Sequence, residues 1–379
     1  MIEPATTGRF LKRPRQRERV DGTLLLLLSL LLMSGLLALF SATYYKAVDQ
    51  GDPLLEVKKQ LIGVALGGAL MLITSRIPYH FWQQPKVVMA GLALSGALLV
   101  AVVIPGVGSS INGSRRWLNY GGLSFQPSEL AKITSVLYLA STLSYRVGRL
   151  DKLFKGVVPL LVVPAIMFLL ILQQPNLSTA GSIMIVAILM ILLAGAKWKH
   201  LGLLGVAAGC VGMLYAWIEP YRRERLLSFR NPFAQMSDEG YQLAQSLIAI
   251  GSGGLFGRGL GQGRQKFSYL PYPESDFIFA IVGEDFGLLG CTAVILLFAA
   301  FAFAGMRIAI SCGDRYGCLL AAGLTAMITV QAMINIGVVI GVLPTTGLPL
   351  PFFSAGGTSI SLLMAATGII LNVSRSCRN

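Results

Sequence analysis

The chain is poor in the residues that build metal sites and disulfide frameworks. Among its 379 residues there are two histidines and five cysteines. His80 and His200 have no thiol or carboxylate nearby at the spacing of metal ligands, so neither histidine predicts a metal site. Cys210 and Cys291 lie in apolar runs, and the other cysteines fall on connections that the charge pattern places in the cytoplasm. A disulfide framework is therefore not expected.

Charge is also scarce, and acidic residues are the scarcer sign. Charged residues make up 13% of the chain, with 17 Asp and Glu against 31 Lys and Arg. Hydrophobic residues reach 54%, and the mean hydropathy is +0.69. A soluble globular domain carries about 25% charged residues. This composition excludes that class and predicts a polytopic membrane protein.

Long apolar runs occupy most of the sequence. Their lengths approach what a helix needs to cross about 30 Å of hydrocarbon. An even number of spans would place both termini on one side of the membrane. The sequence predicts an all-α fold with about ten transmembrane helices, near 23–42, 57–75, 87–104, 128–144, 156–172, 178–196, 200–218, 277–306, 317–342 and 354–373.

Basic residues decide on which side the termini lie. Lys and Arg are concentrated in the N-terminal tail and in alternate connections, so the positive-inside rule places both termini in the cytoplasm. This pattern accounts for most of the net charge of +14, and nucleic acid is not expected as a partner. A lipid-binding or partner-binding tail is the alternative to topological retention. We predict a basic cytoplasmic tail over 1–22, a single transmembrane domain over 23–373 with a large extracytoplasmic loop between helices 7 and 8 near 219–276, and a cytoplasmic tail over 374–379.

An aspartate stands where that large loop meets the eighth predicted helix. Asp276 is followed directly by Phe277 and Ile278. A carboxylate at the mouth of an apolar run loses part of its hydration, which raises its pKa from about 3.9 toward neutrality. It could then accept a proton as a general base. The alternative is an N-cap for the following helix, and the segment alone favours capping.

Two further external segments carry cations. In the first, Arg116 precedes Gln126, which can cap the fourth helix, and Glu129 and Lys132 lie three apart on one helical face, within pairing distance. The second segment has seven glycines within 251–263, followed by Arg264 and Lys266. Backbone amides without side chains, beside cations, could hold a pyrophosphate. The alternative for the glycines is a flexible hinge.

Polar side chains also fall inside the later predicted helices. Glu284 and Asp285 could line a substrate cavity or contact a partner helix. Gln331 and Asn335 lie four apart, and we interpret them as helix-packing hydrogen bonds. Neither pair is predicted to be catalytic.

The motifs together resemble the SEDS family of bacterial cell-wall proteins. The resemblance extends over almost the whole chain. Glu219–Arg223 and Leu260–Lys266 resemble the division branch of the family more than the elongation branch. The motifs that carry the family resemblance are 125–132, 240–263, 275–280, 283–287 and 347–359.

This resemblance implies a peptidoglycan glycosyltransferase of the bacterial cytoplasmic membrane, acting at the division septum. Its substrate would be lipid II, the undecaprenyl-pyrophosphate-linked disaccharide-pentapeptide. Asp276 is implied as the catalytic base of one inverting displacement, because pyrophosphate departs without needing a proton from an acid. The implied partners are a class B penicillin-binding protein transpeptidase and other divisome membrane proteins.

The departing pyrophosphate needs positive charge. Arg116 and Lys132, with Arg264 and Lys266 as weaker candidates, could supply it. Glu129 could orient Lys132. We expect Gln126 to contact the sugar or the helix end. Mg²⁺ or another divalent cation could share the task, although the sequence shows no metal cage and the ligands stay unknown. No organic cofactor is expected.

Four positions depart from the family pattern, among them Ser178, which replaces a glycine. Asn176 replaces an aspartate, which leaves hydrogen bonding at a helix start. Glu274 replaces a histidine and places a like charge two residues before Asp276, which could raise the pKa of Asp276 further. Ala355 replaces a tyrosine and removes a hydroxyl. Three alternatives stay open: a lipid II flippase, an elongation polymerase, and a division scaffold without catalysis.

Overall fold

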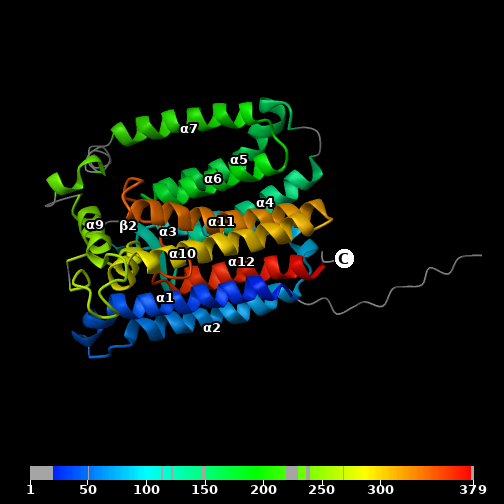
Figure 1. The fold of residues 1–379 in the computed structure, drawn as a ribbon. Helices are drawn as coiled ribbons and strands as arrows, with labels where there is room; N and C mark the ends of the chain where they lie inside the picture. The colour runs from blue at the N-terminus through cyan, green and yellow to red at the C-terminus, as the bar shows by residue number, and fades with distance from the viewer. Residues whose placement is uncertain are drawn as a thin grey trace, which may run out of the picture.

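Long helices running side by side form the body of the molecule, with the connections gathered at its two ends (Figure 1). The computed structural model describes residues 20–49, 51–111, 114–120, 123–146, 150–218, 229–235, 240–267 and 269–376. The long helices are α1 (Gly22–Asp49), α2 (Leu55–Arg76), α3 (Pro85–Val103), α4 (Pro127–Tyr145), α5 (Val158–Leu172), α6 (Leu177–Leu193), α7 (Trp198–Ile218), α9 (Tyr241–Gly253), α10 (Ile278–Ser311), α11 (Arg315–Val339) and α12 (Gly357–Ser376).

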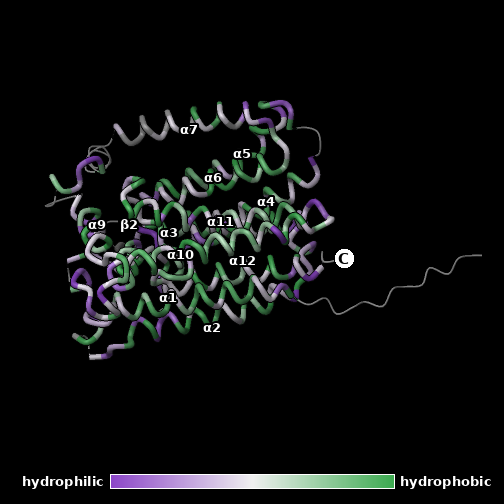
Figure 2. Tube along the Cα trace, viewed as in Figure 1, coloured by the Kyte–Doolittle hydropathy of each residue, from purple (hydrophilic) through white to green (hydrophobic). Residues whose placement is uncertain are grey.

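The predicted apolar runs each lie on one of these helices, and the mainly helical fold is confirmed. Within the described residues, seven helical segments are long and apolar enough to cross a membrane, whereas α6 is shorter. Hydrophobic residues follow the helices along their length, and hydrophilic residues gather toward the ends of the bundle (Figure 2). Outward side chains such as Leu26 and Met33 are exposed, as expected of surfaces that face lipid. The chain is a multi-pass membrane protein.

Short helical turns connect several of these helices, and side-chain caps define several helix starts. The turns are η1 (Tyr79–Gln83), the π-helical η2 (Leu153–Val157) and η3 (Pro232–Gln235). The Asn176 side chain accepts a hydrogen bond from the Thr179 amide, and Asp314 accepts one from Gly317, so each caps the N-terminus of a helix. The predicted hydrogen bonding of Asn176 at a helix start is confirmed.

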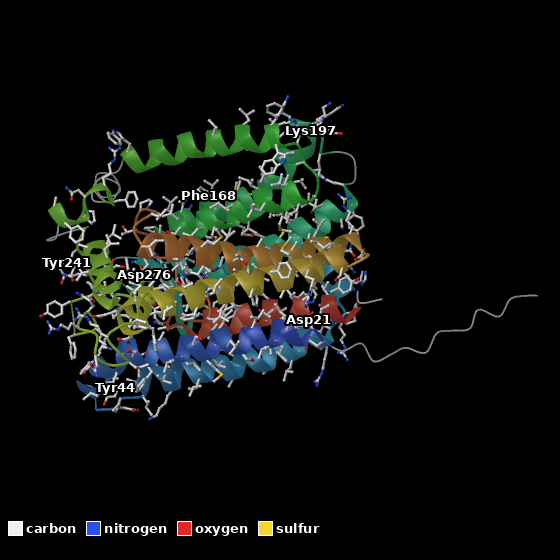
Figure 3. The ribbon with its side chains drawn as sticks, in the orientation of Figure 1. Asp21, Tyr44, Phe168, Lys197, Tyr241 and Asp276 are labelled. Atoms are coloured by element: carbon white, nitrogen blue, oxygen red, sulfur yellow. The ribbon has the colours of Figure 1, made fainter. Side chains whose placement is uncertain are left out.

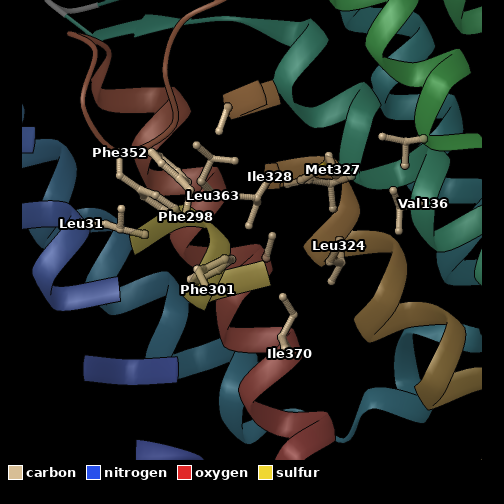
Figure 4. Packing of buried hydrophobic residues seen from close by; sticks show 14 of the residues in the cluster. Leu31, Val136, Phe298, Phe301, Leu324, Met327, Ile328, Phe352, Leu363 and Ile370 are labelled. Atoms are coloured by element: carbon tan, nitrogen blue, oxygen red, sulfur yellow. The ribbon is translucent and has the colours of Figure 1, made fainter. Parts of the chain in front are cut away.

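The core lies among α1, α10, α11 and α12, and aromatic rings anchor the segment before α12 to it. Phe298 and Phe301 on α10 contact Phe353 and Phe352, with ring centroids 6.0 and 6.1 Å apart. Figure 4 shows Phe352 beside Phe298, near Leu363 of α12. These contacts fix the connection between α11 and α12 against α10, so this connection is a rigid part of the bundle.

Glycines let α2 and α12 approach closely. A Cβ added at Gly63 would lie 2.5 Å from the Cα of Gly357, and one at Gly67 would lie 2.7 Å from the Met364 sulfur. Small residues at a helix interface allow close backbone packing inside a membrane. The start of α12, which approaches the candidate site, is therefore fixed by α2.

The two ends of the bundle differ in content. At one end the Asp21 amide donates to Ser374 Oγ at 3.3 Å, and Arg307 pairs with Asp21 at 2.7 Å, so both described ends of the chain meet there. The opposite end carries α9, the loop that precedes Asp276 and a small antiparallel sheet (Figure 1). The sheet order is β1 (Ser109–Ile111), β2 (Ser114–Tyr120) and β3 (Leu123–Phe125).

Two local features were not predicted from the sequence. The sheet pairs Ser109 with Trp117 and Leu118 with Phe125, although nothing in the segment suggested strands. Cys312 is disulfide-bonded, whereas Cys291 and Cys318 are free thiols. The bond at Cys312 was not expected, because the charge pattern places this cysteine on the cytoplasmic side.

Candidate functional site

Asp276 lies in the last turn of the loop that leads into α10 (Figure 3). The N-cap position of α10 belongs to Phe277, and no side-chain cap hydrogen bond is present there. Asp276 therefore precedes the N-cap position by one residue, and capping by its side chain stays a prediction. Phe277, the N-cap residue, is 0% exposed. Asp276 itself is half-buried at the edge of the bundle.

The main chain around Asp276 is held from two sides. Asn335 Nδ2 donates to the Asp276 carbonyl at 2.7 Å, and the Ala355 amide donates to the Glu274 carbonyl at 2.8 Å. The Glu274 carboxylate pairs with Lys46 of α1 at 2.9 Å. The like charge that we expected Glu274 to present to Asp276 is therefore balanced by the Lys46 ammonium.

The Glu129–Lys132 pair on α4 is the second component of the site. Glu129 Oε1 and Lys132 Nζ lie 2.7 Å apart, with side chains 1% and 2% exposed, which confirms the predicted pairing. Burying two charges is costly unless further hydrogen bonds satisfy them. Ser359 of α12 donates to the other Glu129 oxygen at 3.0 Å, and Lys132 donates to Gln331 of α11. A small cavity adjoins Lys132 on the side of α6.

Gln126 and Arg116 stand at the sheet side of this pair. Gln126 occupies the N-cap position of α4 and is buried, but its side chain makes no cap hydrogen bond, so side-chain capping by Gln126 is wrong. Arg116 of β2 donates to the Gln174 carbonyl at 3.1 Å and also to the Pro175 carbonyl. Arg116 therefore joins the sheet to the connection between α5 and α6.

The glycine-rich loop, residues 251–263, makes main-chain hydrogen bonds to α10 where that helix is interrupted. Gly287 has φ 65° and ψ −159°, which interrupts the helix. Loop amides donate to the α10 carbonyls that have no helical partner at this interruption. The Arg258 amide donates to the Glu284 carbonyl at 2.9 Å, and the Gly259 amide to the Asp285 carbonyl at 3.0 Å. The loop also supplies an acceptor, because Leu288 donates to the Gly254 carbonyl at 2.9 Å. Such groups otherwise stay unsatisfied in a low-dielectric interior.

Side chains strengthen the same junction. Glu284 accepts from the Arg264 amide at 2.6 Å and from the Gln265 amide at 3.1 Å. Lys266 Nζ lies 3.0 Å from Asp285 Oδ1 with side chains 1% and 0% exposed, and Ser41 of α1 also contacts both residues. Since α10 occupies these amides, they do not form an open pyrophosphate cradle. These hydrogen bonds also fix the glycine-rich loop to α10, so the loop is not the flexible hinge that was the alternative interpretation.

The predicted site residues therefore fall into three groups. Glu129 and Lys132 connect toward Asp276 through Gln331 and Asn335 of α11, which our sequence interpretation treated as packing alone. Arg116 of the sheet binds carbonyls of the α5–α6 connection, and the Arg264 side chain is exposed. Lys266 belongs to the α10 junction. The spacing of these two amides, one helical turn apart near the end of α11, was visible in the sequence, but their partners, the Pro349 and Asp276 carbonyls, were not.

No cluster suited to a tightly held metal is present in the described part of the chain. No group of three or more His, Cys, Asp or Glu side chains there could hold an ion. Mg²⁺ commonly takes only one or two carboxylates and completes its shell with phosphate oxygens and water. An ion that arrives with a diphosphate needs few protein ligands, so the absence of a cluster among the described residues does not exclude it.

Comparison with known proteins gives consistent matches over nearly the full length. The family model of cell cycle proteins that covers FtsW, RodA and SpoVE matches residues 22–379. Stage V sporulation protein E of Bacillus subtilis (strain 168) is 42% identical over 94% of this chain and 97% of its own. The probable peptidoglycan glycosyltransferase FtsW of Geobacter metallireducens is 37% identical over 95% of this chain and 96% of its own.

Solved structures share the fold. A chain from a structure described as the structural coordination of polymerization and crosslinking by a peptidoglycan synthase complex has a TM-score of 0.76 and 27% identity, covering 94% of this chain and 98% of that one. The rod shape determining protein RodA of Thermus thermophilus has a TM-score of 0.70 and 25% identity, covering 95% of this chain and 98% of its own.

Proposed function

Because this chain belongs to the FtsW, RodA and SpoVE family of cell cycle proteins, we propose that it is a peptidoglycan glycosyltransferase that polymerises lipid II into β-1,4 glycan strands. The observation that carries the proposal is the carboxylate of Asp276, half-buried where a loop enters the membrane helix α10. Its main chain is tied to the same helix that contacts the buried Glu129–Lys132 pair. A fixed carboxylate beside apolar surface suits proton abstraction from a sugar hydroxyl.

The proposed reaction is a single inverting displacement. Asp276 accepts the proton of the acceptor 4-hydroxyl as its oxygen attacks the anomeric carbon of the donor sugar. The new glycosidic bond forms while the bond to the lipid pyrophosphate breaks, and the pyrophosphate keeps the electron pair. Since this leaving group is already a weak base, no acid is required. One carboxylate therefore suffices, in contrast to the pairs used by glycosidases.

The four basic residues predicted to bind the pyrophosphate differ in how accessible they are to a substrate. Arg264 is exposed and Arg116 is half-buried, so these two can meet a diphosphate at the surface. Lys132 and Lys266 are buried in ion pairs with Glu129 and Asp285. They can stabilise the leaving group only through their long-range electrostatic potential, or by direct contact once the ion pair has separated. We assign the first contact with pyrophosphate to the arginines. A divalent cation such as Mg²⁺, arriving with the diphosphate, would supply further charge neutralisation when bound.

The proposed topology has ten spans, cytoplasmic termini and the loop over 219–276 outside the cytoplasmic membrane. The meeting of Asp21 and Ser374 at one end, with Asp276 at the other, supports that orientation. Lys and Arg are also concentrated toward the terminal side. Lipid II would then be polymerised at the outer face. Residues 219–228 lie outside the described residues.

Partner and cellular role follow from the relatives. The synthase complex that shares this fold couples polymerization to crosslinking, which supports a class B penicillin-binding protein as transpeptidase partner. We propose action in septal synthesis, with other divisome proteins, because the relatives include a probable FtsW. The match to a sporulation protein favours a second candidate role, septal synthesis during spore formation. Elongation is the further alternative.

The decisive experiment follows polymerisation of fluorescent lipid II by the purified protein with a partner whose transpeptidase serine is inactivated. We expect polymer from the wild type and loss of about 1000-fold or more in rate for Asp276→Asn, since amide cannot accept the proton. Asp52→Asn is the matched control, because Asp52 is an exposed carboxylate in the connection after α1, paired with Lys58. Control activity should equal that of the wild type.

Equal amounts of polymer from the wild type and Asp276→Asn would show that Asp276 is not the general base. If the wild type forms no polymer, translocation of lipid II in sealed vesicles tests the flippase alternative. A flippase requires polar groups accessible from both leaflets, whereas the residues described above lie toward one end of the bundle.

A further inference from the structure

We propose that Asn335 is a positioning residue that fixes the main chain of Asp276 in the geometry needed for proton abstraction. The inference rests on the proposed function, in which Asp276 is the base. Asn335 lies one turn before the end of α11 and is 1% exposed. It reaches Asp276 from a different helix, 59 residues away in sequence.

One amide nitrogen makes both contacts. Asn335 Nδ2 donates to the Asp276 carbonyl at 2.7 Å and to the Leu348 carbonyl at 2.7 Å. A primary amide has two N–H bonds, so each carbonyl receives one. Both neighbours are acceptors, which fixes the orientation of the side-chain amide. Asn335 therefore clamps the loop before α10 to the connection before α12.

Gln331 extends this arrangement by one helical turn. Gln331 Nε2 donates to the Pro349 carbonyl at 2.9 Å, while its oxygen accepts from Lys132. The adjacent carbonyls of Leu348 and Pro349 are thus held by two amides on one face of α11. Through them, α11 connects Asp276 to the Glu129–Lys132 pair. The base and the buried cation share one rigid frame.

The chemistry of the contact explains why an amide is required. A carboxylate at this position would carry no N–H and would face two carbonyl oxygens in a buried place. An aliphatic side chain would leave both carbonyls without this partner. Movement of the Asp276 main chain by about 1 Å can cost on the order of 100-fold in rate, because a base must lie within hydrogen-bond reach of its proton.

The test compares Asn335→Ala and the milder Asn335→Ser with Asn372→Ala. Asn372 is a matched control because it is also a buried amide with two main-chain contacts, accepting from the Tyr79 amide at 2.8 Å and donating to the Ser75 carbonyl at 2.8 Å. It lies near the end of α12, at the opposite end of the bundle. Each variant is measured for Tm, for kcat and KM with lipid II, and for hydrogen exchange of the peptide 269–280.

The proposal expects kcat of Asn335→Ala to fall by about 10-fold to 100-fold with KM within about twofold, together with faster exchange in 269–280. Asn372→Ala should lower Tm comparably but keep kcat and the exchange of that peptide. Asn335→Ser should fall between Asn335→Ala and wild type. If Asn335→Ala does not fold, Asn335→Ser carries the same expectations.

Three results would overturn the proposal. These are wild-type kcat in a folded Asn335 variant, an equal loss of kcat in Asn372→Ala at matched Tm, or unchanged exchange in 269–280. If the wild type forms no polymer, the proposed function fails separately and hydrogen exchange alone decides. A local rise at 269–280 then supports the clamp, and its absence rejects it.

Discussion

The molecule contains two buried lysine–carboxylate pairs that are alike in chemistry and different in origin. Glu129 and Lys132 lie three apart on one helix, so folding of α4 alone brings them together. Lys266 and Asp285 lie 19 apart and meet only when the glycine-rich loop is docked on the break in α10. The first pair is local and connects to α11 and α12. The second is a tertiary junction between a loop and two helices, with Ser41 of α1 as its third member.

The comparison predicts the largest stability loss at the tertiary pair. Lys266→Met should destabilise the protein by about 3–5 kcal/mol, because Asp285 would be left charged and buried. Thermal unfolding in detergent measures this loss. The double variant Lys266→Met with Asp285→Leu should recover a large part of it. A Tm of Lys266→Met equal to the wild type would show that the junction does not depend on the pair.

The local pair should tolerate exchange of its charges better. In Glu129→Lys with Lys132→Glu the two residues still lie three apart on α4, so the ion pair can form again. Ser359 and Gln331 would then face the wrong groups, and each lost hydrogen bond costs about 1–3 kcal/mol. We expect folded protein with little polymerase activity. The corresponding exchange, Lys266→Glu with Asp285→Lys, should give no folded protein, because it puts the longer lysine where Asp285 is fully buried and the shorter glutamate on the loop, so the pair cannot form again with the loop in its native position.

A fluorescence-detected size-exclusion profile and a lipid II polymerisation assay distinguish the two exchanges. Folded, inactive protein from the α4 exchange and no monodisperse protein from the junction exchange would support the distinction. Equal behaviour of the two exchanged pairs would remove it.

The same difference explains what could be predicted from sequence. The helices followed from long apolar runs, and the Glu129–Lys132 pair followed from helical spacing. The junction at Gly287 could not be predicted, because glycines in 251–263 are equally compatible with a hinge, an anion cradle and a close contact. Only the backbone positions show that their amides complete α10. Asn335 was likewise identified as a hydrogen-bonding residue. Its partner, the Asp276 carbonyl, lies 59 residues away, and helical periodicity predicts only contacts between residues close in sequence.

A smaller effect tests how tightly the loop fits the junction. A Cβ added at Gly263 would lie 2.5 Å from Glu284 Oε2 and 2.8 Å from Asp285 Oδ1. Gly263→Ala should therefore destabilise the protein by about 1–3 kcal/mol through overpacking. Gly251→Ala is the control, because nothing lies within 4 Å of its added Cβ and the residue is in α9. The control should gain about 0.5–1 kcal/mol. Equal Tm changes in both variants would contradict the close fit.

The smallest expected effect concerns the helix cap formed by Asn176. Like the Glu129–Lys132 pair, this cap is formed by residues three apart in sequence. Asn176 accepts from the Thr179 amide at 3.3 Å at the start of α6, so Asn176→Ala should cost about 1 kcal/mol. Asn176→Asp keeps the acceptor and adds negative charge at a helix N-terminus, worth about 0.3–1 kcal/mol. Asn176 is 3% exposed, so desolvation of the new carboxylate offsets that gain. A lower Tm for Asn176→Ala, with a Tm of Asn176→Asp close to that of the wild type, would show that position 176 acts as a cap. A gain in polymerase rate from Asn176→Asp at unchanged stability would instead show that a carboxylate there takes part in the reaction, since a cap alone cannot change the rate without changing the fold.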